Sequence, residues 1–407
     1  MGSNEGGPPD RDHALNMASV AHAMAGTSQQ EKRTGRVAYL VTSSGMGGAE
    51  REVCYLARAF RRRGWEVAAV SMLPLEPPVS DLEADGVHTS SLGMRRGVPD
   101  PRALGRLRDF IRRWQPDVLH AHMVHANLLA RLSRLVAKVP VLVSTIHNQD
   151  EGAQWRYVAY RLTDRLSDVT TTVSRVAVGE AIRRGGVRAN SIQLVPNGIE
   201  TNEYVCDTLR RERTRGSLGL GDRFTWLAVG RLVEAKGYPN MIKAFAQAQE
   251  HHPEARLLIA GAGPLEEALG VAVRRAGTVQ AVSLLGRRSD VPALMQAADG
   301  FVMSSKWEGL PMVLLEAGAS SLPIVATDVG GSRDAILDGV SGYLASSDDP
   351  EAIARAMREV MELSEDDRLA MGAAGRKHIC RNFDIEVVAD RWEELYRGAA
   401  ARSPTRV

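Results

Sequence analysis

The sequence has few cysteines and no long apolar run. It holds three cysteines in 407 residues, Cys54, Cys206 and Cys380, and none of them forms a CxxC pair. Because an odd, scattered set of thiols does not build a disulfide framework, we expect a reducing, cytoplasmic setting. No apolar stretch approaches the roughly 18 residues that a membrane-spanning helix needs, so we expect no such helix.

A large charge excess is also missing. The 51 basic and 49 acidic residues leave a formal net charge of +2, which is too small to argue for a nucleic-acid partner. The arginines nevertheless cluster in the first half of the chain, in RAFRRRGW, GMRRG and RLRDFIRRW. Two interpretations stay open: solvated helix faces, or a basic face that meets anionic lipid head groups or a phosphorylated acceptor.

The N-terminal segment lacks the features of a secretory signal. Residues 1–34 are rich in Gly, Pro, Ser and charge, with only a weak apolar patch, and they do not show the order of basic, apolar and cleavage regions. We expect them to form a disordered tail.

What the sequence does have is a regular alternation of strand-like and helical segments. An apolar run at 37–42 precedes a glycine-rich turn, a helical pattern at 50–63 and the strand-like segment EVAAVSML, which together predict a βαβ unit in a parallel sheet. The alternation restarts at FTWLAVGRL after a polar stretch at 200–222, an expected linker. We therefore predict two doubly wound domains, at 35–206 and 207–382, with ligands bound between them at the carboxyl ends of the strands.

The end of the chain is helical in pattern. The stretch from Pro350 to Ala399 reads as helix throughout, and FDIEVVADRWEELYRG is amphipathic. We predict that the helix at 383–407 leaves the second domain and packs on the first.

Two glycine-bearing turns of the second domain are candidate phosphate sites. Arg231 and Lys236 follow a strand and the glycine Gly230, and their side chains suit a diphosphate clamp. The AGAGP turn around Gly263 exposes backbone N–H groups at a helix start, as does the GMGG turn of the first domain, which ends at Gly48. Taken alone, solvated cations and ordinary tight turns fit equally well.

The histidines raise the question of a metal. His120 and His122 share one strand face and His147 ends the next strand, but no acidic or cysteine ligand accompanies them. The only Asp-x-Asp is Asp10 and Asp12, in the tail. We therefore expect no metal site, and we expect His122, at a carboxyl strand end, to make a polar contact in the crevice.

Two glutamates in SSKWEGLPMVLLEAGA are the strongest candidates for functional carboxylates. Glu308 follows a strand, Pro311 suits the first turn of a helix, and Glu316 lies one to two turns into that helix among apolar residues. Both carboxylates come from one domain, so they suit a grip on vicinal hydroxyls better than paired acid and base catalysis. Because a buried unpaired carboxylate is costly, we expect Glu316 to face a crevice that a ligand fills.

Together these motifs resemble the retaining glycosyltransferases of family 4, which have the GT-B fold. The resemblance covers about 35–399 and is most specific in SSKWEGLPMVLLEAGASSLPIVATDVGG; GMGGAE, DVLHAH, VPNGI, GRLVEAKG, AGAGP and GRRSDV occur in the family order. It implies an α/β protein with two Rossmann-like domains whose parallel sheets face across a cleft. The first would bind the acceptor, the second the nucleotide sugar, and the C-terminal helix would cross back to the first.

The resemblance also implies roles for the candidate residues. Arg231 and Lys236 would hold the donor diphosphate and neutralise the leaving group. Glu316 would accept ribose hydroxyls, whereas Glu308 and His122 would contact the donor sugar. The implied catalytic set is Glu308, Arg231, Lys236 and His122, and the other donor-binding residues are Gly48, Gly230, Gly263, Arg287, Gly309, Leu310, Pro311 and Glu316. Asp334 stands where family sequences often carry Glu, and we leave it out of the set.

The implied activity is metal-independent and needs no cofactor. A hexose would pass with retained configuration from a nucleotide sugar, a UDP-sugar by family habit, to an acceptor hydroxyl in polysaccharide biosynthesis. The acceptor stays open between a lipid-linked or other cell-envelope glycan, a glycolipid and a small molecule, although Met123, Trp155 and Tyr157 near the cleft would suit a lipid at the inner face of a membrane. A sugar-nucleotide epimerase and a non-catalytic sugar-nucleotide-binding protein are the alternatives.

Overall fold

The computed structural model of the chain describes residues 1–2, 34–43, 45, 47–148 and 152–402. The tail predicted at 1–34 and its Asp-x-Asp pair therefore lie almost wholly outside the described residues.

The first half of the chain builds a seven-stranded parallel sheet in the order β3-β2-β1-β4-β5-β6-β7. Its strands are β1 (Arg36–Val41), β2 (Glu66–Ser71), β3 (His88–Ser91), β4 (Val118–His122), β5 (Val141–Ile146), β6 (Val169–Thr172) and β7 (Ile192–Leu194). The central strands are buried along nearly their whole length, as expected for a sheet with helices on both faces. The strand order reverses direction between β1 and β4.

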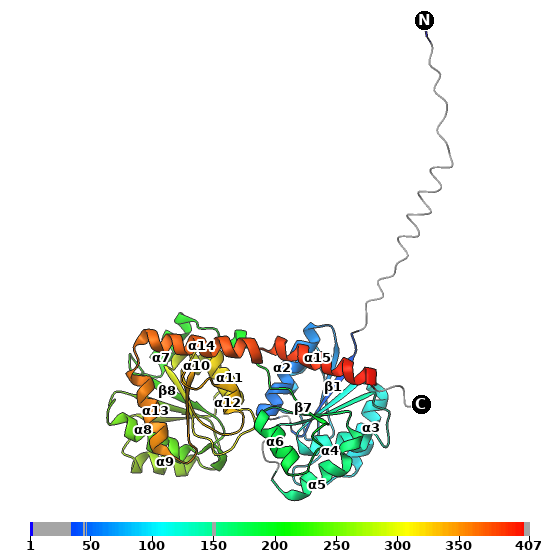
Figure 1. Cartoon of the computed structure of the whole chain (residues 1–407), viewed down its shortest axis with the longest axis horizontal. Helices are drawn as coiled ribbons and strands as arrows, with labels where there is room; N and C mark the ends of the chain where they lie inside the picture. Colours follow the sequence, from blue (N-terminus) through cyan, green and yellow to red (C-terminus); the bar gives the residue numbers. More distant parts are fainter. Residues whose placement is uncertain (3–33, 44, 46, 149–151, 403–407) are drawn as a thin grey trace.

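The second half repeats this plan in a six-stranded parallel sheet, β10-β9-β8-β11-β12-β13. Its strands are β8 (Thr225–Val229), β9 (Arg256–Ala260), β10 (Val282–Gly286), β11 (Gly300–Met303), β12 (Ile324–Thr327) and β13 (Gly342–Ala345). Here the order reverses between β8 and β11. The two halves lie beside each other (Figure 1), and the predicted pair of parallel-sheet α/β domains is confirmed.

Helices connect the strands. The α-helices are α2 (Gly48–Arg62), α3 (Arg102–Trp114), α4 (Val124–Ser133), α5 (Gln154–Thr163), α6 (Arg175–Arg183), α7 (Thr208–Ser217), α8 (Tyr238–Gln249), α9 (Glu266–Arg275), α10 (Val291–Ala297), α11 (Met312–Ala319), α12 (Ser332–Ala335), α13 (Pro350–Glu362), α14 (Glu365–Phe383) and α15 (Ile385–Arg402). The 3-10 helices are η1 (Ser80–Asp85), η2 (Asp164–Leu166), η3 (Thr201–Tyr204) and η4 (Glu234–Lys236). The end of the chain, predicted as continuous helix, is divided into α13, α14 and α15.

The prediction that 200–222 is a linker is wrong in part, because this stretch contains η3 and α7. No residue of α7 is buried, so the helix shows no apolar periodicity in the sequence. It is held by charge instead: Arg211 and Arg215 both pair with Asp299, at 2.5 and 3.0 Å.

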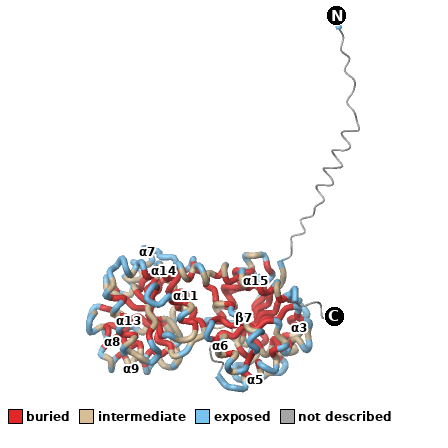
Figure 2. Tube along the Cα trace, viewed as in Figure 1, coloured by how far each residue is buried: buried red, intermediate tan, exposed pale blue. Residues whose placement is uncertain are grey.

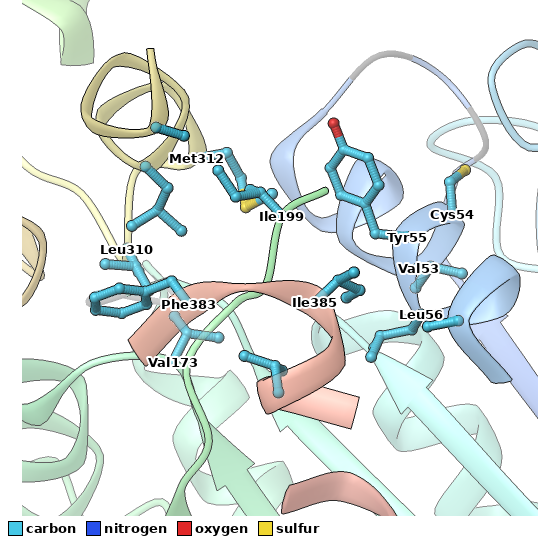
Figure 3. Close-up of a cluster of buried hydrophobic side chains, with 14 of the residues drawn as sticks. Val53, Cys54, Tyr55, Leu56, Val173, Ile199, Leu310, Met312, Phe383 and Ile385 are labelled. Carbon is cyan, nitrogen blue, oxygen red and sulfur yellow. The ribbon is translucent and has the colours of Figure 1, made fainter. Parts of the chain in front are cut away.

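The C-terminal helices run from one half to the other. Figure 1 shows α14 over the second half and α15 over the first, so the predicted crossing is confirmed. At the crossing the backbone of Ile199 accepts a hydrogen bond from Ile385 and donates one to Phe383, both at 2.9 Å. These side chains join a buried apolar cluster that includes Leu310 and Met312 from the second half (Figure 3).

One of the arginine clusters is used to dock α15. Arg62, the last residue of α2, and Arg63 directly after it both pair with Glu386, at 2.7 and 2.8 Å, and Arg63 also reaches Asp390 at 2.7 Å. Neither a free solvated face nor a lipid-binding face describes this part of RAFRRRGW, because its charges are compensated within the molecule. Over the part of the chain that the structure describes, no helix has the length and apolarity to cross a membrane.

Candidate active site

The candidate residues gather at the points where the strand order reverses. In each doubly wound sheet such a point opens a crevice beyond the carboxyl ends of the strands. In the first sheet, Gly48 opens the helix that follows β1 and His122 ends β4. In the second sheet, Arg231 follows β8 and Glu308 follows β11. Sequence patterning therefore assigned these residues to the correct strand ends.

A charged pair forms at the reversal point of the second sheet. The Nζ of Lys236 lies 2.5 Å from Oε1 of Glu308, and Ser305 Oγ donates to the same oxygen at 2.6 Å. Arg231 is exposed, and among the described residues it makes no ion pair. The site thus holds one cation engaged with a carboxylate and one cation that faces solvent.

The turns after β8 and β9 pack closely against each other. A Cβ at Gly261 would lie 1.9 Å from the carbonyl oxygen of Gly230, and a Cβ at Gly263 would lie 2.5 Å from that of Leu232. Only glycine fits such an approach. The tight turns therefore set the path of the loop that carries Arg231. Arg287, after β10, is exposed.

The segment after Glu308 touches the first half of the molecule. A Cβ at Gly309 would lie 1.8 Å from the carbonyl oxygen of His147, so the two backbones meet there. Asn197 donates to the carbonyl of Leu310 at 3.2 Å. Gly48 lies next to Met312, the residue that follows Pro311. A Cβ at Gly48 would lie 3.4 Å from Met312 Cγ.

The histidines of the first half lie in this contact region. His122 and His147 share a hydrogen bond of 2.9 Å between Nδ1 and Nε2. Burial lowers the pKa of His147 to about 4, and burial together with the neighbouring imidazoles lowers the pKa of His122 well below its ordinary value. Both rings are therefore neutral near pH 7. Nε2 of His122 is buried and has no hydrogen-bond partner among the described groups.

His120 belongs to a different network. Its two ring nitrogens bond to Tyr396 Oη and Thr145 Oγ1, each at 2.7 Å. Tyr396 lies on α15, so His120 helps to seat the crossing helix. Across the described residues, no group of three His, Cys, Asp or Glu side chains is placed to hold a metal ion.

The expectation that Glu316 faces an open crevice is wrong. Its side chain is fully buried, and Nη1 of Arg51 lies 2.7 Å from its Oε1. Arg51 comes from α2 in the first half and also donates to the hydroxyls of Tyr55 and Tyr204, at 3.1 and 3.0 Å. Burial raises the pKa of Glu316 and the guanidinium opposes that rise.

The contact between Arg51 and Glu316 is ionic rather than a directed hydrogen bond. Both carboxylate oxygens lack a hydrogen-bond partner among the described groups, although the ion-pair distance is short. Sequence reasoning missed Arg51. A signal was available, because a carboxylate in an apolar helix needs a cation, and Arg51 directly follows GMGGAE.

A second missed residue is Glu50. It is buried, and Ser43 Oγ donates to its Oε1 at 2.5 Å. Burial raises the pKa of this carboxyl, against the hydrogen bond from Ser43 and the charges of Arg231 and Arg96. The carboxyl of Glu50 in the first half therefore interacts electrostatically with Arg231 in the second half.

Asp334 also joins the two halves. Its carboxylate accepts from the backbone N–H of Arg175 at 3.2 Å, and the Arg175 side chain lies 3.6 Å away. Asp334 lies on α12, and its carboxylate thus contacts the first residue of α6; no contact with a nucleotide sugar follows from this.

Two family models match the chain. Residues 46–203 match the model described as Glycosyltransferase Family 4, and residues 210–378 match Glycosyl transferases group 1. The first match covers the first sheet except β1, and the second match covers all strands of the second sheet.

Curated relatives extend over most of the chain. One is the glycogen synthase of Mycobacterium tuberculosis strain H37Rv, 29% identical over 87% of this chain and 92% of its own. Another is the GDP-mannose-dependent alpha-(1-6)-phosphatidylinositol monomannoside mannosyltransferase of Mycolicibacterium smegmatis, 30% identical over 74% of this chain and 81% of its own.

A solved structure shares the fold. HepE of Anabaena, in complex with UDP-glucose, superposes with a TM-score of 0.81 and 21% identity, over 89% of this chain and 100% of its own.

Proposed function

The chain belongs to the family 4 glycosyltransferases, and from that membership we propose that it moves a hexose from a nucleoside-diphosphate sugar to an acceptor hydroxyl with retained anomeric configuration. The comparisons establish the GT-B fold and the transferase class. The observation that carries the finer proposal is the convergence of Arg231, Lys236 and Glu308 at the reversal point of the second sheet.

The donor proposed is a UDP-sugar. The Anabaena neighbour was solved with UDP-glucose, which supports this choice, whereas the mycobacterial mannosyltransferase depends on GDP-mannose. The second half would bind the donor: Arg287 lies beside the base, Glu316 accepts ribose hydroxyls, and the backbone of Gly309 and the two residues after it lines the sugar and phosphate. Because Glu316 is fully buried, a ribose would reach it only after the groups that cover it move.

The reaction depends on charge at the diphosphate. Arg231 offers a guanidinium fork and Lys236 a compact ammonium, and together they would neutralise the charge that develops on the leaving phosphate. The bond from the sugar C1 to the phosphate oxygen breaks, and the acceptor oxygen bonds to C1 on the same face. The departing phosphate oxygen takes the acceptor proton, so no protein nucleophile is required.

Glu308 and His122 would position the sugar. The carboxylate of Glu308 accepts hydrogen bonds from sugar hydroxyls, while its contact with Lys236 keeps it oriented. Neutral His122 has one buried ring nitrogen without a partner among the described groups, and this nitrogen suits a single sugar hydroxyl. Positioning of this kind lowers the barrier without covalent chemistry.

The acceptor proposed is a lipid-linked or other cell-envelope glycan. Both the mycobacterial mannosyltransferase and an Escherichia coli relative that is 25% identical, a galactosyltransferase named for a diphosphoundecaprenol substrate, take lipid-borne acceptors by their names. We propose a cytoplasmic reaction that needs no metal and no cofactor. The three free cysteines support the reducing setting.

Donor hydrolysis tests the proposal. The purified chain is incubated with UDP-, GDP- and TDP-sugars, with and without EDTA. We expect one nucleotide sugar to be hydrolysed above background, unaffected by EDTA, and the rate to be lost in Glu308→Gln. A new sugar epimer formed without acceptor would identify an epimerase instead. Tight nucleotide-sugar binding with neither hydrolysis nor transfer would overturn catalysis.

A further inference from the structure

Helix α5 exposes an apolar side to solvent. Tyr157 and Tyr160 face the protein and are buried, whereas Trp155, Val158 and Leu162 are exposed by 54%, 50% and 79%. Residues spaced three and four apart lie on one side of a helix, so these three form a continuous apolar strip. A helix on the surface of a globular protein ordinarily turns its polar side outward.

The end of α4, the helix that packs beside α5, and the turn after it also expose apolar side chains. Leu132, Leu135 and Val136 are also exposed. The two helices are fastened together because Arg131 of α4 donates to the carbonyl of Tyr160 at 3.0 Å. We call the set Trp155, Val158, Leu162, Leu132, Leu135 and Val136 the α4–α5 face; α5 forms the outer edge of the first half (Figure 2).

Positive charge borders the α4–α5 face. Arg161 of α5 and Arg165 of η2 are both exposed, and the carboxylate that these two elements carry is Asp164. Asp164 is buried and pairs with Arg188 at 2.7 Å, so it does not offset the charge at the surface. Lys138, just after Val136, is exposed as well.

We infer that the α4–α5 face binds an anionic lipid surface. Tryptophan and branched aliphatic side chains enter the boundary between head groups and acyl chains, while arginines stay at the level of the phosphates. One arginine cluster of the sequence, RAFRRRGW, lies at α2, where Arg62 and Arg63 pair with α15. The lipid contact inferred here is at a different helix, one whose apolar side is uncovered.

A second copy of the chain is a poorer occupant. In a twofold contact the same surface patch meets itself. The positive border would then meet the same positive border of the other copy, and the described part of α5 offers no exposed carboxylate to compensate it. Anionic head groups supply the missing negative charge.

The α4–α5 face belongs to the half of the molecule that carries His122 and His147. Strand β5 ends beside His147, whose backbone meets Gly309, and α5 is the next helix along the chain. A bilayer bound there would lie against the half that we propose binds the acceptor. The inference goes beyond the proposed transfer reaction, because lipid binding can be measured with neither donor nor acceptor present.

Vesicle sedimentation tests the inference. The full chain is spun with vesicles of phosphatidylglycerol and phosphatidylcholine in equal parts, and with phosphatidylcholine alone. We expect binding to the anionic vesicles only. The triple variant Trp155→Ser, Val158→Ser, Leu162→Ser should stay in the supernatant, and Arg161→Gln with Arg165→Gln should weaken binding about 25-fold, at about fivefold per arginine.

A matched variant controls for loss of exposed apolar surface elsewhere. Leu369 and Val279 are as exposed as the residues of α5 but lie on the second half, so Leu369→Ser with Val279→Ser should sediment like the wild type. Equal sedimentation of the triple variant would overturn the inference. So would a wild-type dimer, seen by light scattering, that the triple variant abolishes.

A nucleotide assay separates this inference from the proposed function. Without vesicles, the triple variant should hydrolyse donor as the wild type does. Hydrolysis absent from both proteins, with vesicle binding intact, would refute the proposed function and leave the lipid contact standing. Loss of hydrolysis in the triple variant alone would show that its fold is damaged. The arginine pair variant then decides: loss of vesicle binding with hydrolysis intact would support the lipid inference, and unchanged vesicle binding would overturn it.

Discussion

The two reversal points of the molecule differ in charge. At the second sheet, Arg231, Lys236 and Glu308 bring two cations and a carboxylate to the crevice. At the first sheet, His122 and His147 present neutral imidazoles held by burial. A leaving diphosphate needs charge compensation, whereas a sugar hydroxyl needs only a hydrogen bond. In the proposed reaction, the second edge would therefore stabilise charge and the first edge would position the sugar.

The same contrast appears within one motif. Glu308 pairs with Lys236 of its own half and stays partly open, whereas Glu316 is fully buried and pairs with Arg51 of the other half. Two glutamates eight positions apart thus have different dependencies. Glu308 is set by its own domain, and Glu316 by how the two domains meet.

Removing Arg51 should have the largest effect, on the free energy of unfolding. Arg51→Met leaves Glu316 as a buried carboxylate without its cation, and we expect a loss of about 3–5 kcal/mol in the free energy of unfolding, measured by urea titration. The loss should shrink as the pH falls, since protonation relieves the buried charge.

Two variants control this result. Adding Glu316→Gln to Arg51→Met should restore most of the loss. Arg58→Met removes another arginine of the same helix whose pair with Asp85 is partly exposed, and should cost no more than about 1 kcal/mol. Equal losses for Arg51 and Arg58 would contradict a special role for the cross-domain pair.

Removing Lys236 should act on the charged edge alone. We expect Lys236→Ala to lower kcat about 10²–10³-fold, because one electrostatic contact to the developing charge is lost, and to weaken binding of the nucleoside diphosphate. Lys306→Ala is the matched control, since Lys306 pairs with Glu234 at the exposed surface. Unchanged diphosphate affinity in Lys236→Ala, by calorimetry, would refute the clamp.

Acid should lower the stability of the protein through His147, one of the two neutral imidazoles of the first sheet. Burial holds the pKa of His147 at about 4, below its ordinary 6.5, so below pH 6.5 the unfolded chain binds a proton that the folded protein does not. Stability should therefore fall as the pH drops from 6.5 toward 4, by at most about 1.4 kcal/mol per pH unit for this residue.

The comparison with His147→Asn isolates that effect. Buried carboxyls such as Glu52 have raised pKa values and act in the opposite direction, but both proteins contain them. The variant should lose stability less steeply between about pH 6.5 and 5, by chemical denaturation. Parallel slopes would contradict a neutral buried His147.

The smallest effect is expected at the crossing helix. Arg62 pairs with Glu386 at the surface of both partners, so Arg62→Gln should cost about 0.2–1 kcal/mol. High salt should erase the difference, because exposed ion pairs are screened. A larger, salt-independent loss in the urea midpoint would mean that Arg62 supports α15 through packing.

The sequence predictions were correct where they depended on local residue patterns. They were wrong where a residue depends on an ion pair with a residue far away in the sequence. Apolar strands followed by glycine turns identified both sheets and placed Arg231 and Glu308 at the right strand ends. The helix α7 was missed because its stability comes from Asp299, far along the chain. Glu316 was assigned an open crevice because its partner, Arg51, lies on a helix that only folding brings near.

The crossing at Ile199 has a consequence for the continuity of the chain. The backbone passes from the first half to the second beside the point where it returns, and hydrogen bonds of Ile199 to Phe383 and Ile385 join the two passages. A cut at exposed Cys206 would sever the outward passage alone. The returning one would still tether the halves, so the protein offers a natural position for splitting it into two fragments that reassemble, or for new termini in a circular permutant.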